Sequence, residues 1–276
     1  MPYALCNDAN IYYEVHGRGA PLLFINGLKA DHANWFKLKN LLIGRYQVIL
    51  FDNRAVGRTQ DEGKPLSVET MADDVAALMT HLQLSDVMVV GHSLGGAIAQ
   101  MLAYKYPQKV KSLFLLNTFL KLNDKAKAGL HQVLQLHKQG QSAATITEAM
   151  LPWGFSKSFL TPAIKEAILE LSGLNPYPQS EQDFQRQYQA LIGFDSSAWV
   201  EKIQQPTVVV TSKEDMTATP QESAVLAAKM QRAKLIKLRG GHASPIEQTQ
   251  ALSTIIKFEI EKFNNSAASD RDCFLI

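Results

Sequence analysis

The sequence predicts an α/β fold, in which a doubly wound, mostly parallel sheet of about eight strands carries an inserted helical cap. Apolar runs of strand length alternate with helical patterns over most of the 276 residues. The runs are rich in β-branched residues and nearly continuous in apolar character, as strands covered on both faces are. One long segment, residues 120–200, contains no such run, so we expect it to leave the sheet and return.

Strand patterns begin near the N-terminus. Residues 10–17 alternate between apolar and polar side chains and end at a Gly-Arg-Gly turn. With the apolar run at 21–26 they are expected to form an early β pair. The parallel strands that follow are expected at residues 46–53, 86–92, 110–118, 206–212 and 233–240.

Helical patterns separate these strands, which is the doubly wound order. In the helix expected over residues 67–83, Ser67 and Thr70 can cap the N-terminus, and Val75 and Leu78 recur at helical spacing. The other helices of the core are expected at residues 32–44, 94–106, 220–231 and 244–263.

The segment without strand runs is expected to be a cap over the carboxyl ends of the strands, where it would roof a site. Trp153 and Phe155 belong to its most apolar cluster. Their side chains are expected either to pack the cap on the core or to line a substrate pocket, and both roles stay open. The expected bounds are 1–119 and 201–265 for the core, 120–200 for the cap and 266–276 for a polar, mobile tail.

Composition and charge exclude several classes of function. The chain carries 28 basic and 26 acidic residues, a balance too even to predict nucleic acid or an anionic surface as a partner. Cys6 and Cys273 stand at opposite ends with neither metal-binding spacing nor a disulfide framework, which favours a reducing compartment. The sequence shows neither a signal peptide nor an apolar run of about 20 residues. We therefore expect a soluble cytoplasmic protein.

The C-terminal residues, Cys273-Phe274-Leu275-Ile276, are similar to a prenylation signal. Isoleucine is not a typical final residue of such a signal, and no polybasic run supplies the second signal that stable anchoring takes. A chance cysteine near a chain end is the simpler interpretation, so no stable membrane association is expected.

Residues 91–95, Gly-His-Ser-Leu-Gly, place Ser93 directly after a strand pattern and directly before a helical one. In this context a Gly-x-Ser-x-Gly sequence is typical of a nucleophile elbow, whose strained turn lifts the serine hydroxyl above the strand end. The alternatives are a glycine-rich turn that only packs a helix on the sheet and a phosphate-binding loop. The second lacks the Lys-Ser/Thr pair and the Gly-x-Gly-x-x-Gly spacing. Ser93 is therefore the candidate nucleophile.

A serine hydroxyl needs a base, and the base needs an orienting acid. Asp215 lies in the loop after one buried strand, and His242 lies in the loop after the last strand. Asn117, which follows another strand, cannot supply a carboxylate. Because Ser93, Asp215 and His242 each follow a strand of a parallel sheet, we expect them at the same end of that sheet.

Neighbouring candidates fit these roles less well. Glu214 could replace Asp215 in principle, but the spacing of Asp215 to the helix that begins near Pro220 favours Asp215. His92 adjoins Ser93, yet neighbours on a sharp turn point apart, so we expect His92 to shape the elbow. The other histidines lie in expected turns or helices and are expected to be solvated or packed; they are His16, His32, His81, His131 and His137.

The chain resembles the α/β-hydrolase superfamily, particularly its small cap-bearing esterases, enol-lactonases and cofactor-free haloperoxidase-like members. The similarity runs through the elbow region at residues 71–118, the cap exit at 175–210 and the histidine loop at 240–248. The resemblance implies an oxyanion hole made by the backbone N–H groups of Leu28 and Leu94. It also implies that no metal and no organic cofactor is needed.

Two residues depart from the pattern of this superfamily. Asn26 stands where a histidine is usual, in the loop that carries one oxyanion donor. Asn26 is expected either to hold this loop or to reach the substrate, so it joins Trp153 and Phe155 as a candidate pocket residue. Ala55 stands where the superfamily usually has glycine.

These residues predict a serine hydrolase that cleaves a carboxylic ester, thioester or lactone of a small molecule through an acyl-enzyme. A receptor or sensor that binds a small molecule under the cap with slow or no turnover is the alternative from another class. Perhydrolysis, as in haloperoxidase-like enzymes, also stays open because peroxide can replace water on an acyl-enzyme.

Overall fold

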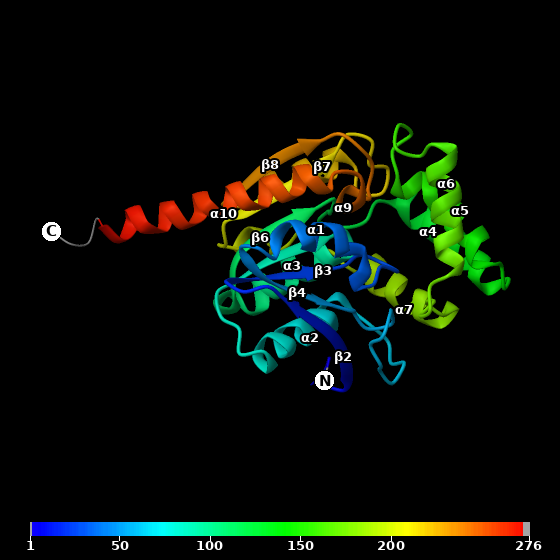
Figure 1. Cartoon of the computed structure of the whole chain (residues 1–276), viewed down its shortest axis with the longest axis horizontal. Coiled ribbons are helices and arrows are strands. Elements are labelled where there is room, and N and C mark those ends of the chain that lie inside the picture. Colours follow the sequence, from blue (N-terminus) through cyan, green and yellow to red (C-terminus); the bar gives the residue numbers. More distant parts are fainter. Residues whose placement is uncertain (1, 273–276) are drawn as a thin grey trace.

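The computed structural model describes residues 2–272, with side chains described through residue 265. It contains an eight-stranded, mostly parallel sheet flanked by helices, which confirms the predicted fold class (Figure 1). The strand order across the sheet is β1-β2-β4-β3-β5-β6-β7-β8. The bounds are β1 Tyr3–Cys6, β2 Ala9–His16, β3 Ala20–Ile25, β4 Tyr46–Phe51, β5 Val87–His92, β6 Val110–Leu116, β7 Thr207–Ser212 and β8 Ala233–Leu238.

The N-terminal strands pair differently from the expectation. β2 is antiparallel to β1 and β4, while β3 is parallel to β4 and β5, so the expected pair of residues 10–17 with 21–26 does not form. β4 lies between them, and its Val48 pairs with His16 on one side and Leu22 on the other. An apolar strand such as β4 is better covered between two neighbours than left at an edge. β1 was not expected because its four residues are too few to show a strand pattern.

Two apolar cores hold helices against the two faces of the sheet. On one face α2, α3 and α8 pack through residues that include Val75, Leu102 and Leu226. On the other face α1 and α10 pack through residues that include Leu38 and Ile256. Coverage on both faces explains why the strand runs are continuously apolar. The bounds are α1 Phe36–Leu42, α2 Val68–His81, α3 Leu94–Lys105, α8 Pro220–Lys229, α9 Ser244–Glu247 and α10 Thr249–Asp272.

The segment between β6 and β7 contains four α-helices, which we call the helical insertion. In Figure 1 this insertion forms one end of the molecule. Each helix begins after a polar side chain that accepts a hydrogen bond from a backbone N–H of its first turn, and these side chains are Asn123, Ser142, Thr161 and Ser180. The bounds are α4 Asp124–Lys138, α5 Ala143–Gly154, α6 Pro162–Gly173 and α7 Glu181–Ile192.

The C-terminal helix is longer than the sequence pattern predicts. The helix expected at 244–263 is divided at Gln248 into α9 and α10, and α10 continues to Asp272. Cys273 and its prenylation-like context lie outside the described residues. Within residues 2–272, no helix combines the length and the apolar character that crossing a membrane requires.

Gly95 lets the first turn of α3 approach the end of β3. A Cβ at this position would collide with the carbonyl oxygen of Ile25. We expect Gly95→Ala to lower the free energy of unfolding by about 1–3 kcal/mol, the usual cost of overpacking, in urea denaturation. Gly44→Ala is the control, because no atom lies within 4 Å of a Cβ there. Equal losses in the two variants would contradict this account of the contact.

Candidate active site

Ser93 occupies the turn between β5 and α3 in a strained conformation. Its φ of 54° and ψ of −118° lie outside the regions that residues other than glycine usually adopt. The turn is held at its carbonyl group, since the Ser93 carbonyl accepts hydrogen bonds from the Gly96 and Ala97 amides and from Thr118 Oγ1. No hydrogen bond ties the Ser93 side chain to the start of the helix. The hydroxyl is therefore free to face another group, as an elbow requires.

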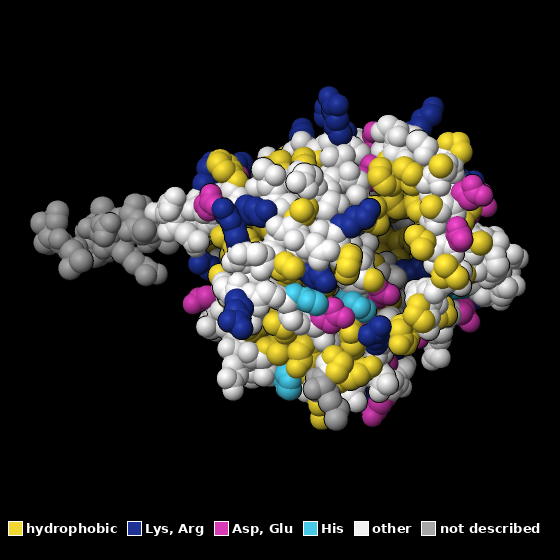
Figure 2. Space-filling view, in the orientation of Figure 1, with side chains coloured by type: hydrophobic (Ala, Val, Ile, Leu, Met, Phe, Trp, Pro, Cys, Tyr) yellow, Lys and Arg dark blue, Asp and Glu magenta, His cyan; other side chains and the backbone are white. Residues whose placement is uncertain are grey.

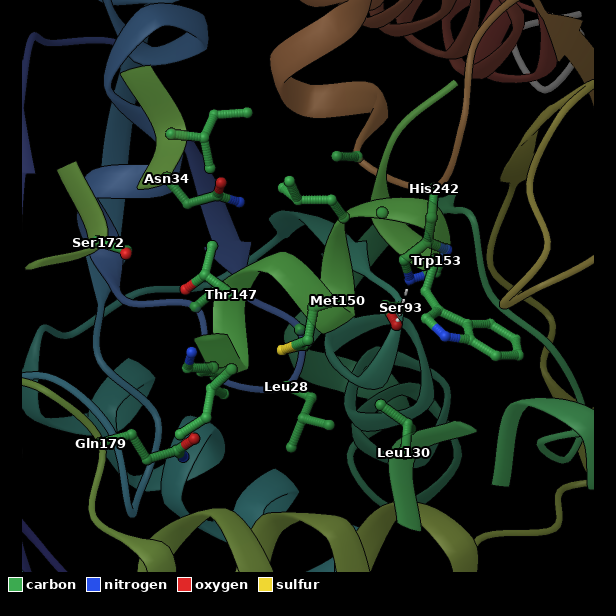
Figure 3. A pocket seen from close by; sticks show the side chains of 18 of the residues that line it. Leu28, Asn34, Ser93, Leu130, Thr147, Met150, Trp153, Ser172, Gln179 and His242 are labelled. Atoms are coloured by element: carbon green, nitrogen blue, oxygen red, sulfur yellow. Dashed lines mark hydrogen bonds between the residues drawn. The ribbon is translucent and has the colours of Figure 1, made fainter. Parts of the chain in front are cut away.

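The structure brings Ser93, His242 and Asp215 together from three loops. Ser93 Oγ lies 2.8 Å from His242 Nε2 (dashed in Figure 3), and His242 Nδ1 lies 2.8 Å from Asp215 Oδ2. A carboxylate only accepts, so Nδ1 carries the proton and Nε2 is the acceptor for the serine hydroxyl. Glu214 does not take part, because its carboxylate accepts instead from the backbone N–H of Lys157.

Asp215 is fixed at both of its oxygens. Oδ1 accepts from the backbone amides of Thr217 and Ala218 at 2.8 and 2.9 Å, and Oδ2 also accepts from Asn117 Nδ2 at 2.8 Å. Ser244 in turn donates to Asn117 Oδ1. The sequence excluded Asn117 as an acid but did not reveal this orienting contact. The sequence indicates this contact only through the position of Asn117 directly after β6, next to the loop that carries Asp215.

The His92 side chain supports the loop that carries His242. Its Nε2 lies 2.8 Å from the carbonyl oxygen of His242. Burial, and next the neighbouring His242, lowers the pKa of His92 from 6.5 to about 3. At neutral pH His92 is therefore an uncharged donor to the loop that carries His242.

Leu28 and Leu94 lie in the loops expected to supply oxyanion donors. Leu28 follows β3 and lines the cavity beside Ser93, while Leu94 is the first residue of α3. Among residues 2–272, the hydrogen bonds outside regular helices and strands include none donated by either backbone N–H. Both amides therefore keep their hydrogen-bonding capacity for a ligand.

Asn26 has the contacts of a residue that holds this loop. It is fully buried, its Nδ2 donates to the Asp31 carbonyl at 2.7 Å, and its Oδ1 accepts from Asn34 at 3.1 Å. It is not among the side chains that line the cavity. Of the two roles expected for Asn26, these contacts favour holding the loop. Ala55 adopts a φ of 65°, a conformation that explains why glycine is usual there.

A cavity of about 640 Å³ lies between the carboxyl end of the sheet and the helical insertion. Ser93 and His242 line it from the core, and Met150, Trp153 and Phe155 line it from α5 and the residue that follows (Figure 3). In Figure 2 the surface is hollowed beside the insertion, and hydrophobic side chains surround the hollow. The candidate triad therefore opens onto a cavity whose lining is mostly apolar.

Several polar residues of the cavity were not recognised in the sequence. Lys29, His137 and Gln179 line it, although His137 was expected to be solvated or packed elsewhere. For Lys29, the sequence indicates a place in the cavity only through its position directly after Leu28. His137 and Gln179 come from the insertion and the loop before α7, whose packing on the core the sequence does not specify.

Asp31, His32 and Asp52 bring potential metal ligands within 4.8 Å of one another. Asp52 already accepts hydrogen bonds from the backbone N–H groups of His32 and Arg58 and contacts His32 Nδ1 at 2.8 Å. These bonds explain the cluster as a support for the loops after β3 and β4, and we assign no metal to it.

Comparisons with known proteins bear on the fold of the chain. Residues 20–249 match the family described as alpha/beta hydrolase fold. The chain is 29% identical over 254 residues to the "Putative carbamate hydrolase RutD" of Azorhizobium caulinodans, with 88% of this chain and 92% of that protein covered. It is 25% identical over 259 residues to the 3-oxoadipate enol-lactonase 2 of Acinetobacter baylyi, at 93% and 95% coverage. A solved thermophilic esterase from Thermogutta terrifontis has 25% identity and a TM-score of 0.81, covering 92% of this chain and 94% of that chain.

The low pKa of His92 makes stability depend on pH. Below pH 6.5 the unfolded chain protonates His92, whereas the folded protein does so only near pH 3, so stability falls as the pH drops through this window. We expect the free energy of unfolding of His92→Gln to fall less steeply over this range, in urea denaturation at a series of pH values. Equal slopes for the two proteins would contradict a buried, uncharged His92.

Proposed function

The chain belongs to the α/β-hydrolase fold family and is a hydrolase, and we propose that it cleaves a carboxylic ester, thioester or lactone through an acyl-enzyme on Ser93. The observation that carries this proposal is the unbroken line of hydrogen bonds from Ser93 through His242 to Asp215 at the wall of the cavity. Each residue has the contact that its role in a nucleophile–base–acid triad needs.

In the first step, Ser93 Oγ attacks the carbonyl carbon while its proton passes to His242 Nε2, 2.8 Å away. The imidazolium that forms is stabilised by Asp215, whose oxygens are held by the Thr217, Ala218 and Asn117 donors. The electron pair of the carbonyl moves onto its oxygen. When the carbonyl re-forms, the bond to the leaving oxygen or sulfur breaks, and His242 returns the proton to it.

The negative oxygen of the intermediate needs donors that are in place before the reaction. We assign this role to the backbone N–H groups of Leu28 and Leu94. Because the donors are backbone groups, the asparagine at position 26 does not remove them. Asn26 contributes by holding the loop of Leu28 through its bonds to Asp31 and Asn34.

In the second step, His242 takes a proton from water, and the hydroxide equivalent attacks the acyl carbon. Ser93 Oγ leaves and recovers the proton, which releases the carboxylic acid. A lactone gives one hydroxy-acid product because its two halves remain joined. The residues of this chain supply every proton transfer in the cycle. We further propose that the enzyme acts on small molecules in the cytoplasm.

Ser93→Ala is expected to lower kcat/KM for a p-nitrophenyl acyl ester by roughly 10⁴- to 10⁶-fold, because it removes the nucleophile that the triad activates. The melting temperature should change little, which separates loss of chemistry from loss of folding. Ser67→Ala, which removes a helix cap outside the cavity, is the matched serine control and should keep the rate. Full turnover by Ser93→Ala would show that the proposed mechanism is wrong.

Fluorophosphonate labelling separates the enzyme from a receptor with the same fold. An activated Ser93 should react with the probe within minutes and lose turnover in proportion to labelling, since the probe traps the activated serine. Ser93→Ala should remain unlabelled. A protein that binds esters in the cavity but neither reacts nor turns over would be a receptor or sensor instead.

A further inference from the structure

Lys29 introduces a positive charge into a cavity that is otherwise mostly apolar. It follows Leu28 in the loop after β3, so it lies one residue from the proposed oxyanion donor. Its φ of 67° is in the left-handed region, which is unfavourable for a residue with a side chain. The Lys29 backbone N–H donates to Gln187 Oε1 at 3.0 Å, and this bond ties the loop to α7.

The Lys29 ammonium has no partner of opposite charge. Among the described residues, no ion pair or hydrogen bond joins its Nζ to another group, and no aspartate or glutamate lines the cavity. Burial lowers the pKa of Lys29, and no neighbouring carboxylate acts against that effect. Lys29 is partly exposed, so its charge is not fully removed from water, but an ammonium without a counter-charge at the wall of a mostly apolar cavity is available to an anionic ligand.

Two other polar side chains of the cavity also have unused atoms. His137 Nε2 and Gln179 Oε1 are buried and lack a hydrogen-bond partner, and of the two only His137 Nε2 can donate to an anion. Burial, and next the charge of Lys29, lowers the pKa of His137, so its imidazole is neutral at neutral pH and can present an N–H. Gln179 is held in place because its Nε2 donates to the Ala55 carbonyl at 2.7 Å and to Gln187 Oε1.

From this arrangement we propose that the cavity binds the carboxylate of an anionic substrate at Lys29, so that the enzyme prefers esters, thioesters or lactones that carry a free carboxylate. This inference rests on the proposed function. A carboxylate would neutralise the single unpaired ammonium and accept a second hydrogen bond from His137. A doubly charged phosphate would bring more negative charge than the lining offsets. Hydrolysis creates a second carboxylate, and the one cation cannot neutralise both, which favours product release.

The proposal is tested by comparing charged and neutral esters of the same length. The charged series consists of p-nitrophenyl monoesters of succinate, glutarate, adipate, pimelate and suberate, and the neutral series consists of their methyl p-nitrophenyl diesters. We expect kcat/KM to favour at least one charged member, and Lys29→Met to lower this charged-to-neutral ratio roughly 10- to 100-fold, mainly through KM. Lys29→Met keeps an unbranched side chain at the same φ, so backbone strain is unchanged.

Two further variants identify the cause of the change. Lys29→Arg keeps the charge and should retain most of the ratio. Lys138→Met removes the same charge from an exposed position on α4, next to His137 in sequence, and should leave the ratio as in the unchanged protein. If Lys138→Met lowered the ratio as much as Lys29→Met, general electrostatic attraction would explain the preference and the proposal would be overturned.

The carboxylate could lie on either side of the scissile bond. Acyl esters of glycolate and 3-hydroxypropionate place it on the alcohol side, and their release is followed by acid titration. The absence of a Lys29-dependent preference in both series would overturn the proposal. Calorimetric binding of the monoesters to Ser93→Ala, with and without Lys29→Met, reports on the subsite even if no ester is turned over. Failure of the subsite and failure of the proposed chemistry are thereby distinguishable.

Discussion

The strained backbone of Ser93 is the constraint on which the site depends. Such a conformation costs about 1–3 kcal/mol and persists only where its surroundings over-determine it. Here β5 is paired on both sides, by β3 and β6, and α3 begins immediately after the serine with Gly95 against the end of β3. The apolar cores on both faces of the sheet keep these elements in register. The stability of the sheet is thus used to hold one hydroxyl clear of the backbone.

The groups around Ser93 divide into a polar support and an apolar lining. Three hydrogen bonds connect the carboxyl ends of β5, β6, β7 and β8. Asn117 donates to Asp215, and Ser244 donates to Asn117. His92, the last residue of β5, contacts the carbonyl oxygen of His242. The helical insertion closes the other side with mostly apolar side chains. Beside such an apolar lining a fixed charge or dipole acts more strongly than in bulk water. This stronger electrostatic interaction would help the oxyanion donors, and it would also strengthen the attraction between the unpaired ammonium of Lys29 and an anionic substrate.

Much of this architecture could be predicted from local sequence. Continuous apolar runs identified the parallel strands, and the Gly-x-Ser-x-Gly turn identified Ser93 together with loops that place Asp215 and His242 at the same sheet end. The features that were predicted wrongly or missed depend on long-range contacts. β4 lies between β2 and β3 in the sheet, and the sequence of each strand by itself does not specify which strands become its neighbours. Likewise, Lys29 and His137 become neighbours of one cavity only when the insertion packs on the core, and no spacing in the chain reports that packing.

We propose that Ser93, activated by His242, carries the acyl group during turnover. Rapid acid quenching of the enzyme during hydrolysis of a p-nitrophenyl ester, followed by peptide mass spectrometry, shows which residue is acylated. We expect an acyl group on Ser93, present during turnover and lost when substrate is exhausted. An acyl group on another residue, or turnover without any acylated peptide even when deacylation is slowed, would contradict this proposal.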